Sequence, residues 1–199
     1  MVLLNCIKNK NFVSLMNANK RGYIWIVSSI KFNKKIDVNS EKDMHERETI
    51  RRDLIINNKA ALVVGGGKKW GDIVSVGSIN LVSQKFKDLI IKNKVKNIQF
   101  HPIYIKSGND SIAYYHLEPL IKSQKIISVE KLSYPYLIIN KDNYEFNKTL
   151  TYFNITNAEE EDIFGIEDTY FLIISNKLKK VLEKGKLTNL YFDSLWQIK

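Results

Sequence analysis

Apolar residues along this chain follow two different spacings, one typical of strands and one typical of helices. Residues 23–30 form a β-branched and aromatic run, which is the composition of a buried strand. Further strands are expected at residues 111–117 and 133–140, the second at a sheet edge because it contains Pro135. Residues 37–52 are instead densely charged with alternating signs, a pattern that fits an exposed helix and a mobile loop equally well.

The same spacings recur in two segments that form an internal repeat. Residues 81–90 align with residues 173–182 without a gap, and the register continues through Phe100 over Phe192 to Tyr104 over Trp196. Every aligned pair has the same offset, since 192 − 100 = 92. The chain is therefore expected to contain two copies of one structural unit, at about residues 78–106 and 170–198.

Each copy has the pattern of a strand, a helix and a second strand. Ser83 and Ser175 follow apolar runs and stand where a side-chain hydroxyl can cap a helix. Apolar residues then fall at i, i+3 and i+4, which predicts one buried helix face and a lysine-rich outer face. These residues are Phe86, Leu89 and Ile90 in the first copy and Leu178, Val181 and Leu182 in the second. The following strands alternate apolar and polar residues and place Phe100 and Phe192 at matching buried positions.

These elements predict an α+β fold with mixed sheets and few helices, built around two related strand-helix-strand units. Both copies lie within residues 72–199. Residues 1–71 form an N-terminal region to which the sequence assigns no role. One continuous domain over the whole chain is the alternative to two separate regions.

The composition is that of a folded protein, because hydrophobic residues make up 44% and aromatic residues 11% of the chain. The first residues lack the basic and apolar stretches of a secretory signal, and no segment approaches the roughly 20 apolar residues of a membrane-spanning helix. The single Cys6 fits a reducing compartment. A cytoplasmic protein without a membrane partner is therefore expected.

The charge balance suggests a macromolecular partner. Lys and Arg number 31 against 21 Asp and Glu, a net charge of +10, which is compatible with nucleic acid, a membrane surface or an acidic protein as partner. Lys87, Lys179 and Lys180, on the outer faces of the two predicted helices, are the candidate partner-binding residues. Nucleic-acid binding also requires exposed aromatic rings, and core packing accounts for the aromatics in the apolar runs. These are Tyr23, Trp25, Phe100, Phe192 and Trp196.

No catalytic motif is present in the sequence. The three histidines, His45, His101 and His116, lie far apart, and none has a His or Cys at metal-ligand spacing. The glycines at residues 65–67 precede a lysine but lack the spacing of a phosphate-binding P-loop, and they predict a flexible turn beside a packed Trp70. The sequence therefore predicts no enzyme activity, no catalytic residue, no cofactor and no metal.

Several short motifs also occur in a fixed order over residues 72–198. They lie at residues 81–86, 97–103, 115–117, 127–134, 162–164, 171–178 and 187–192. Together they resemble a large family of immunity proteins from bacterial polymorphic toxin systems. One departure from the family pattern is the absence of a basic residue soon after Phe164, where Gly165 and Ile166 stand.

The resemblance implies a protein that binds one cognate toxin and covers its active site or blocks a movement that it needs. It does not identify the contact residues, because each immunity protein is fitted to its own toxin. The expected function is thus an immunity protein with a cognate protein toxin as its partner. The alternative is a basic nucleic-acid-binding protein.

Overall fold

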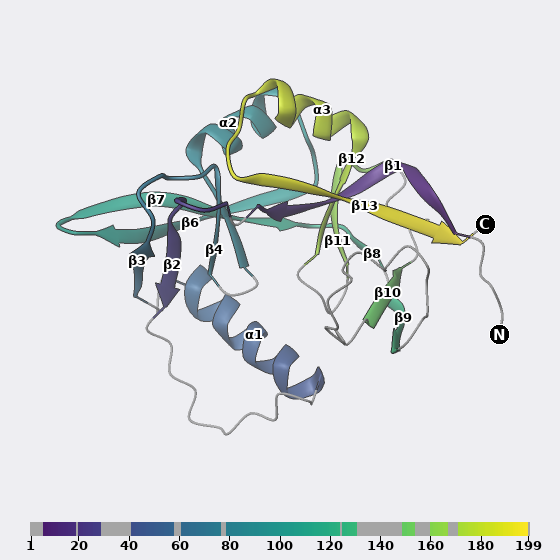
Figure 1. Cartoon of the computed structure of the whole chain (residues 1–199), viewed down its shortest axis with the longest axis horizontal. Coiled ribbons are helices and arrows are strands. Elements are labelled where there is room, and N and C mark those ends of the chain that lie inside the picture. The colour runs from purple at the N-terminus through teal and green to yellow at the C-terminus, as the bar shows by residue number, and fades with distance from the viewer. Residues whose placement is uncertain are drawn as a thin grey trace.

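The computed structural model describes residues 6–18, 20–28, 41–57, 61–76, 79–123, 125–130, 149–153, 160–166 and 171–198. Within them the protein has an α+β fold, in which helices pack on mixed sheets (Figure 1). The predicted fold class is therefore confirmed. The helices are α1 (Glu41–Ile56), α2 (Gln84–Lys92) and α3 (Asn176–Lys184).

The described strands form two large sheets and one small one. The larger sheet has the order β2 (Trp25–Ser28), β3 (Leu62–Gly66), β6 (Ile98–Ser107), β7 (Asp110–Pro119), β5 (Ile79–Val82), β4 (Ile73–Val76). The second has the order β13 (Leu190–Ile198), β1 (Cys6–Asn17), β12 (Leu172–Ser175), β11 (Ile163–Ile166), β8 (Lys122–Ser123). The small sheet pairs β9 (Lys125–Glu130) with β10 (Thr149–Phe153).

The local predictions from the sequence agree with these elements. The run at residues 23–30 contains β2, and the expected strand at 111–117 lies within β7. In the charged segment, residues 41–52 belong to α1, so the helix is the correct alternative there, and residues 37–40 lie outside the described residues. The strand expected at residues 133–140 lies outside the described residues.

The repeat predicted from the constant offset is present. Ser83 and Ser175 cap α2 and α3, each accepting a hydrogen bond from the backbone N–H three residues later, at 3.2 and 3.0 Å. The turns after the helices match as well, because left-handed backbone angles recur at positions 92 residues apart. They are Lys94 (φ 54°) with Lys186 (φ 51°) and Asn97 (φ 55°) with Asn189 (φ 62°).

Each unit is one strand longer than the sequence suggested. A hairpin precedes each helix, β4–β5 before α2 and β11–β12 before α3. Asp72 stands before the first hairpin and Asp162 before the second. Their carboxylates accept hydrogen bonds from the Oγ atoms of the capping serines Ser83 and Ser175, at 2.6 and 2.8 Å. Asp, hairpin, Ser, helix and strand thus form the repeated structure.

The N-terminal strand completes the second unit. The first unit has the strand order β6-β7-β5-β4, and the second has β13-β1-β12-β11, so β1 occupies the place that β7 has in the first. The registers agree, since Phe100 pairs with Leu117 and Phe192 with Leu15. Residues of the region 1–71, which the sequence left without a role, therefore contribute to both large sheets.

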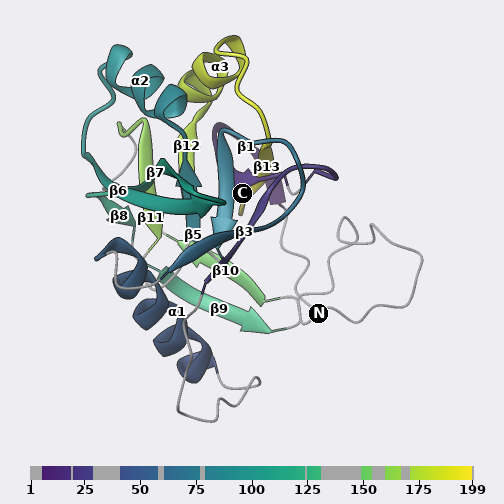
Figure 2. The same cartoon turned by 90° about the vertical axis from the view of Figure 1, so that its left-hand side faces the viewer.

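Helices α2 and α3 lie side by side on one side of the protein and α1 lies on the opposite side (Figures 1 and 2). One buried cluster lies under α2 and α3 and includes Phe86, Ile90, Leu178 and Leu182. A second cluster joins Ile55 of α1 to the larger sheet. Phe100 and Phe192 occupy matching positions and pack against the first cluster, but they are only partly buried, so the expectation that they are buried is met only in part.

A buried amide connects the two units. Asn189 is 1% exposed and donates hydrogen bonds from Nδ2 to Oδ1 of Asn17 (2.6 Å) and to the backbone oxygen of Ile73 (2.9 Å). Its Oδ1 accepts from the backbone N–H of Lys20 at 3.2 Å. The equivalent Asn97 is exposed and contacts only Glu161 through its side chain, at 2.8 Å, among the hydrogen bonds described. The repeat therefore diverges where one copy meets the other.

Candidate partner-binding surfaces

Two of the three lysines predicted to bind a partner have intramolecular contacts. The ammonium of Lys87 lies over the ring of Tyr115, 3.9 Å from its centroid, and 5.7 Å from that of Phe100. Lys179 occupies the equivalent position in α3, with Nζ 5.3 Å from the ring centroid of Phe192. Cation–π contacts of this kind hold a side chain on its own protein. These lysines therefore have a structural role that the sequence did not indicate.

Lys180, the third candidate, is exposed on α3. It belongs to a wider set of lysines on the two helices and the turns that follow them. The exposed members of this set are Lys85, Lys92, Lys94, Lys96, Lys177, Lys180, Lys184 and Lys186. We call this set the lysine face.

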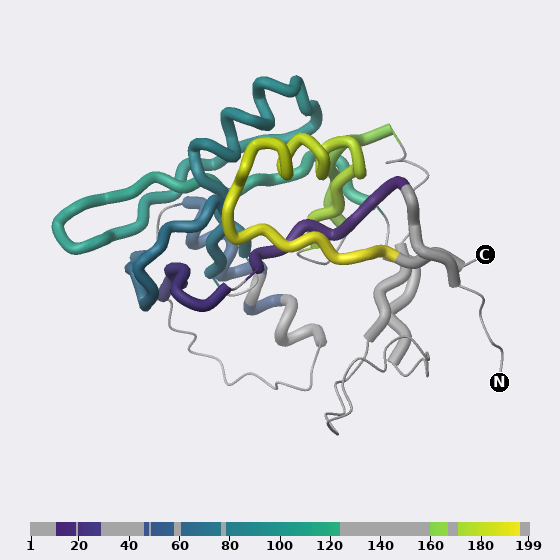
Figure 3. The backbone as a smooth tube through the Cα atoms, turned by 45° about the horizontal axis from the view of Figure 1, so that its top comes forward, coloured from purple at the N-terminus to yellow at the C-terminus, as the bar shows by residue number. Residues whose placement is uncertain are grey.

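The lysine face is one surface because α2 and α3 pack against each other (Figure 3). Lys85 Nζ donates a hydrogen bond to the backbone oxygen of Lys186 at 2.9 Å. Gly185 packs against Leu89 so closely that a Cβ on the glycine would lie 2.4 Å from Cδ2 of the leucine. The repeat thus brings together lysines that are distant in sequence.

A second surface lies on the larger sheet, where β2, β3 and β6 carry exposed apolar side chains. Trp25 and Tyr104 are each 56% exposed, and Val27 and Val63 are about 40% exposed. The interpretation of Trp25 as a core residue is therefore wrong. It fails because β2 is the outer strand of the sheet and alternates, with Ile26 buried on one face and its neighbours exposed on the other.

Two glycines provide the support for Trp25. A Cβ on Gly65 would lie 2.4 Å from the indole ring, and one on Gly66 would lie 2.4 Å from Nε1. The ring therefore rests on the bare backbone of β3. The glycine run is thus partly strand, not only the turn that was predicted, while Trp70 packs as expected, with its ring 5.7 Å from that of Tyr114.

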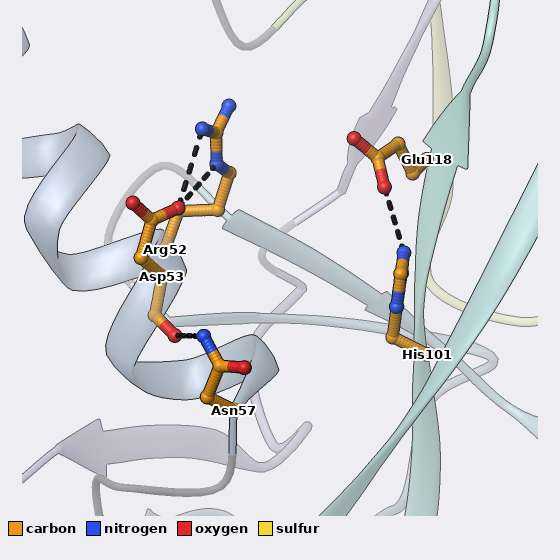
Figure 4. A network of polar contacts seen from close by, with 5 residues as sticks. All are labelled: Arg52, Asp53, Asn57, His101 and Glu118. Atoms are coloured by element: carbon orange, nitrogen blue, oxygen red, sulfur yellow. Dashed lines mark hydrogen bonds and ion pairs between the residues drawn. The ribbon is translucent and has the colours of Figure 1, made fainter.

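The opposite face of the same sheet carries a polar cluster beneath α1. His101 Nε2 and Glu118 Oε2 are 2.7 Å apart, and the rings of His101 and His116 stack with centroids 6.0 Å apart. Arg52 of α1 lies across from the His101–Glu118 pair and hydrogen-bonds Asp53 (Figure 4). The sheet therefore brings together two histidines that lie 15 residues apart in sequence, since 116 − 101 = 15.

The protonation states of this cluster follow from burial and charge. Burial lowers the pKa of His116 to about 4, and the charges of His101 and Arg52 act in the same direction against the opposing effect of Glu118. Burial acts to raise the pKa of Glu118, but the hydrogen bond with His101 and nearby positive charges hold it below its usual range. At neutral pH His116 is uncharged and Glu118 is ionised.

A pocket of about 80 Å³ lies beside His116, between the two large sheets. Its polar wall is formed by Arg52, Asn80, Glu118 and Lys122 together with the histidine. No Ser, Thr, Cys or Tyr lines it, so the described residues here offer no hydroxyl or thiol nucleophile for the histidine to activate. Nor do three or more metal-ligating side chains converge anywhere in the described parts of the chain.

Comparison of the chain with protein-family models and with curated proteins gave no match. In the described residues no helix is long and apolar enough to cross a membrane.

Proposed function

We propose that this chain is an immunity protein, which binds a cognate toxin domain of a bacterial polymorphic toxin system in the cytoplasm and neutralises it. The proposal rests on the resemblance of residues 72–198 to that family. The observation that supports it best is the lysine face, a group of eight exposed lysines on two packed helices and the turns that follow them. Such a surface complements an acidic partner and speeds its encounter.

Neutralisation is tested by co-expression with the toxin domain encoded beside the chain. The expected result is restored growth and a complex that survives size-exclusion chromatography. Cell death in the presence of folded protein, together with the absence of a complex, contradicts the proposal.

The lysine face is tested separately by charge reversal. Lys180→Glu changes an exposed residue, so it is expected to slow association with the toxin domain and to flatten its dependence on salt without altering the fold. Lys87→Glu and Lys179→Glu also remove a cation–π contact, so their thermal stability must be measured alongside. An unchanged association rate and salt slope for all three variants removes Lys87, Lys179 and Lys180 from the interface.

Nucleic-acid binding is the second candidate function. It is favoured by Trp25 and Tyr104, which are exposed aromatics on a sheet of a basic protein. Titration of a fluorescent single-stranded oligonucleotide tests it. Binding that weakens steeply with salt supports this function, and the absence of binding at low salt contradicts it.

A further inference from the structure

We infer that the exposed apolar side chains of β2, β3 and β6 form the docking surface for the partner protein, with Trp25 as its anchor. We call this surface the tryptophan face; its apolar members are Trp25, Val27, Val63 and Tyr104. The inference rests on the proposed function, and it names the surface and the chemistry of the partner that fits it.

The strand registers make the tryptophan face continuous. Val27 pairs with Val63 across β2 and β3, and Val63 pairs with Lys106 across β3 and β6. Trp25 lies two residues from Val27, and Tyr104 lies two residues from Lys106, so each shares a sheet face with its neighbour. The side chains therefore form one strip over three adjacent strands.

Helix α2, which carries part of the lysine face, borders this strip. Paired residues lie on the same face of a sheet, as do residues two apart in one strand. Tyr104 is therefore on the same face as Pro102, and Pro102 pairs with Tyr115. Tyr115 is the ring that Lys87 of α2 covers. Helix α2 thus covers one end of this side of the sheet, and the tryptophan face is the part that it leaves uncovered.

Trp25 is held in place before any partner arrives. The indole lies against Gly65 and Gly66, which leaves its outer side accessible while its inner side is packed. A tryptophan ordered in advance loses little conformational entropy on binding, and tryptophan is among the residues enriched at the energetic hot spots of protein interfaces.

The basic residues around the strip indicate the charge of the partner's surface. Lys106 lies within it, and exposed Lys68 and Lys69 follow β3. The backbone N–H groups of Lys68 and Lys69 donate to the oxygen of Gly22, which places them beside the turn that follows exposed Lys20 and Arg21. None of the strands β2, β3 and β6 contains a carboxylate. The complementary partner has an apolar pocket for the indole, ringed by acidic side chains.

A protein fits this strip better than a single-stranded nucleic acid. The centre of the strip is the aliphatic pair Val27 and Val63, which separates the two aromatic rings, whereas stacking of successive bases requires rings that neighbouring nucleotides can reach. An apolar centre with a polar rim is the usual anatomy of a protein interface.

The test measures the affinity of the purified toxin domain for the full chain and three variants. Trp25→Ala removes the anchor and should raise the Kd at least about 30-fold, the effect of a strong interface anchor. Gly65→Ala keeps the indole but adds a Cβ where the ring lies, so it should displace the ring and also weaken binding. Tyr191→Ala is the matched control, because Tyr191 is 51% exposed on the other large sheet and should leave the Kd unchanged.

The outcomes of this test distinguish failure of the proposed docking surface from failure of the immunity function. Toxin binding that is equally tight for Trp25→Ala overturns the tryptophan face and leaves the immunity function standing. No binding by the unmodified chain overturns the immunity function, and with it this inference. If a labelled thymidine oligonucleotide binds instead and Trp25→Ala abolishes that binding, the surface is a nucleic-acid site and the protein-docking inference is wrong. Circular dichroism and urea unfolding confirm that each variant is folded.

Discussion

Acidification should destabilise the protein through His116. Burial holds the pKa of His116 at about 4, against an ordinary value of 6.5 in the unfolded chain. Between these values the unfolded state binds a proton that the folded state does not, so stability is lost as pH falls from 6.5 towards 4. The loss is about 1.4 kcal/mol per pH unit, which amounts to about 2 kcal/mol at pH 5 relative to pH 7.5.

The comparison with His116→Gln isolates this contribution. Glutamine cannot titrate. The free energy of unfolding of the variant should therefore fall by about 2 kcal/mol less than that of the unmodified protein between pH 7.5 and pH 5. Urea unfolding at both pH values measures the difference. Glu118 contributes little to the change in stability over this pH range. Its pKa is lowered in the folded protein, so the stability that it contributes is lost only below about pH 4.5. Parallel pH dependences of the two proteins would refute the reasoning.

Two further predictions concern the repeat. Ser83→Ala and Ser175→Ala should each cost about 1 kcal/mol in urea unfolding, because each removes a helix cap and an aspartate contact; unequal costs by more than a factor of about 3 would contradict the equivalence of the units. Asn189→Ala should cost about 3 kcal/mol, because it leaves buried backbone groups unpaired at a left-handed position, whereas Asn97→Ala should cost about 1 kcal/mol. Equal costs for the two asparagines would show that the buried amide does not join the units.

The sequence predicts the repeated helices well because their determinants are local. A capping serine and apolar residues at i, i+3 and i+4 act within one or two turns, so a constant offset reveals both copies. The constant offset does not reveal the paired aspartates Asp72 and Asp162, because the spacing from Asp to Ser differs between the copies. It is 83 − 72 = 11 in the first copy and 175 − 162 = 13 in the second.

Features that depend on distant residues could not be predicted in the same way. The place of β1 between β12 and β13 follows from long-range pairing, and no local pattern in residues 6–17 indicates it. The exposure of Trp25 depends on its strand lying at the edge of the sheet. A signal for Tyr104 did exist, since it alternates with the buried Ile103 and Ile105.

The two units differ in how far apart in sequence their paired strands lie. Phe100 and Leu117 are 17 residues apart in sequence (117 − 100), whereas Leu15 and Phe192 are 177 apart (192 − 15). Closing the longer loop costs about 2 kcal/mol more in chain entropy, since this cost grows with the logarithm of loop length. During synthesis on the ribosome the first unit can form its strand pairs early, while β1 must wait until β13 emerges. Pairing of β1 with β13 is therefore expected to be slower than closure of the first unit.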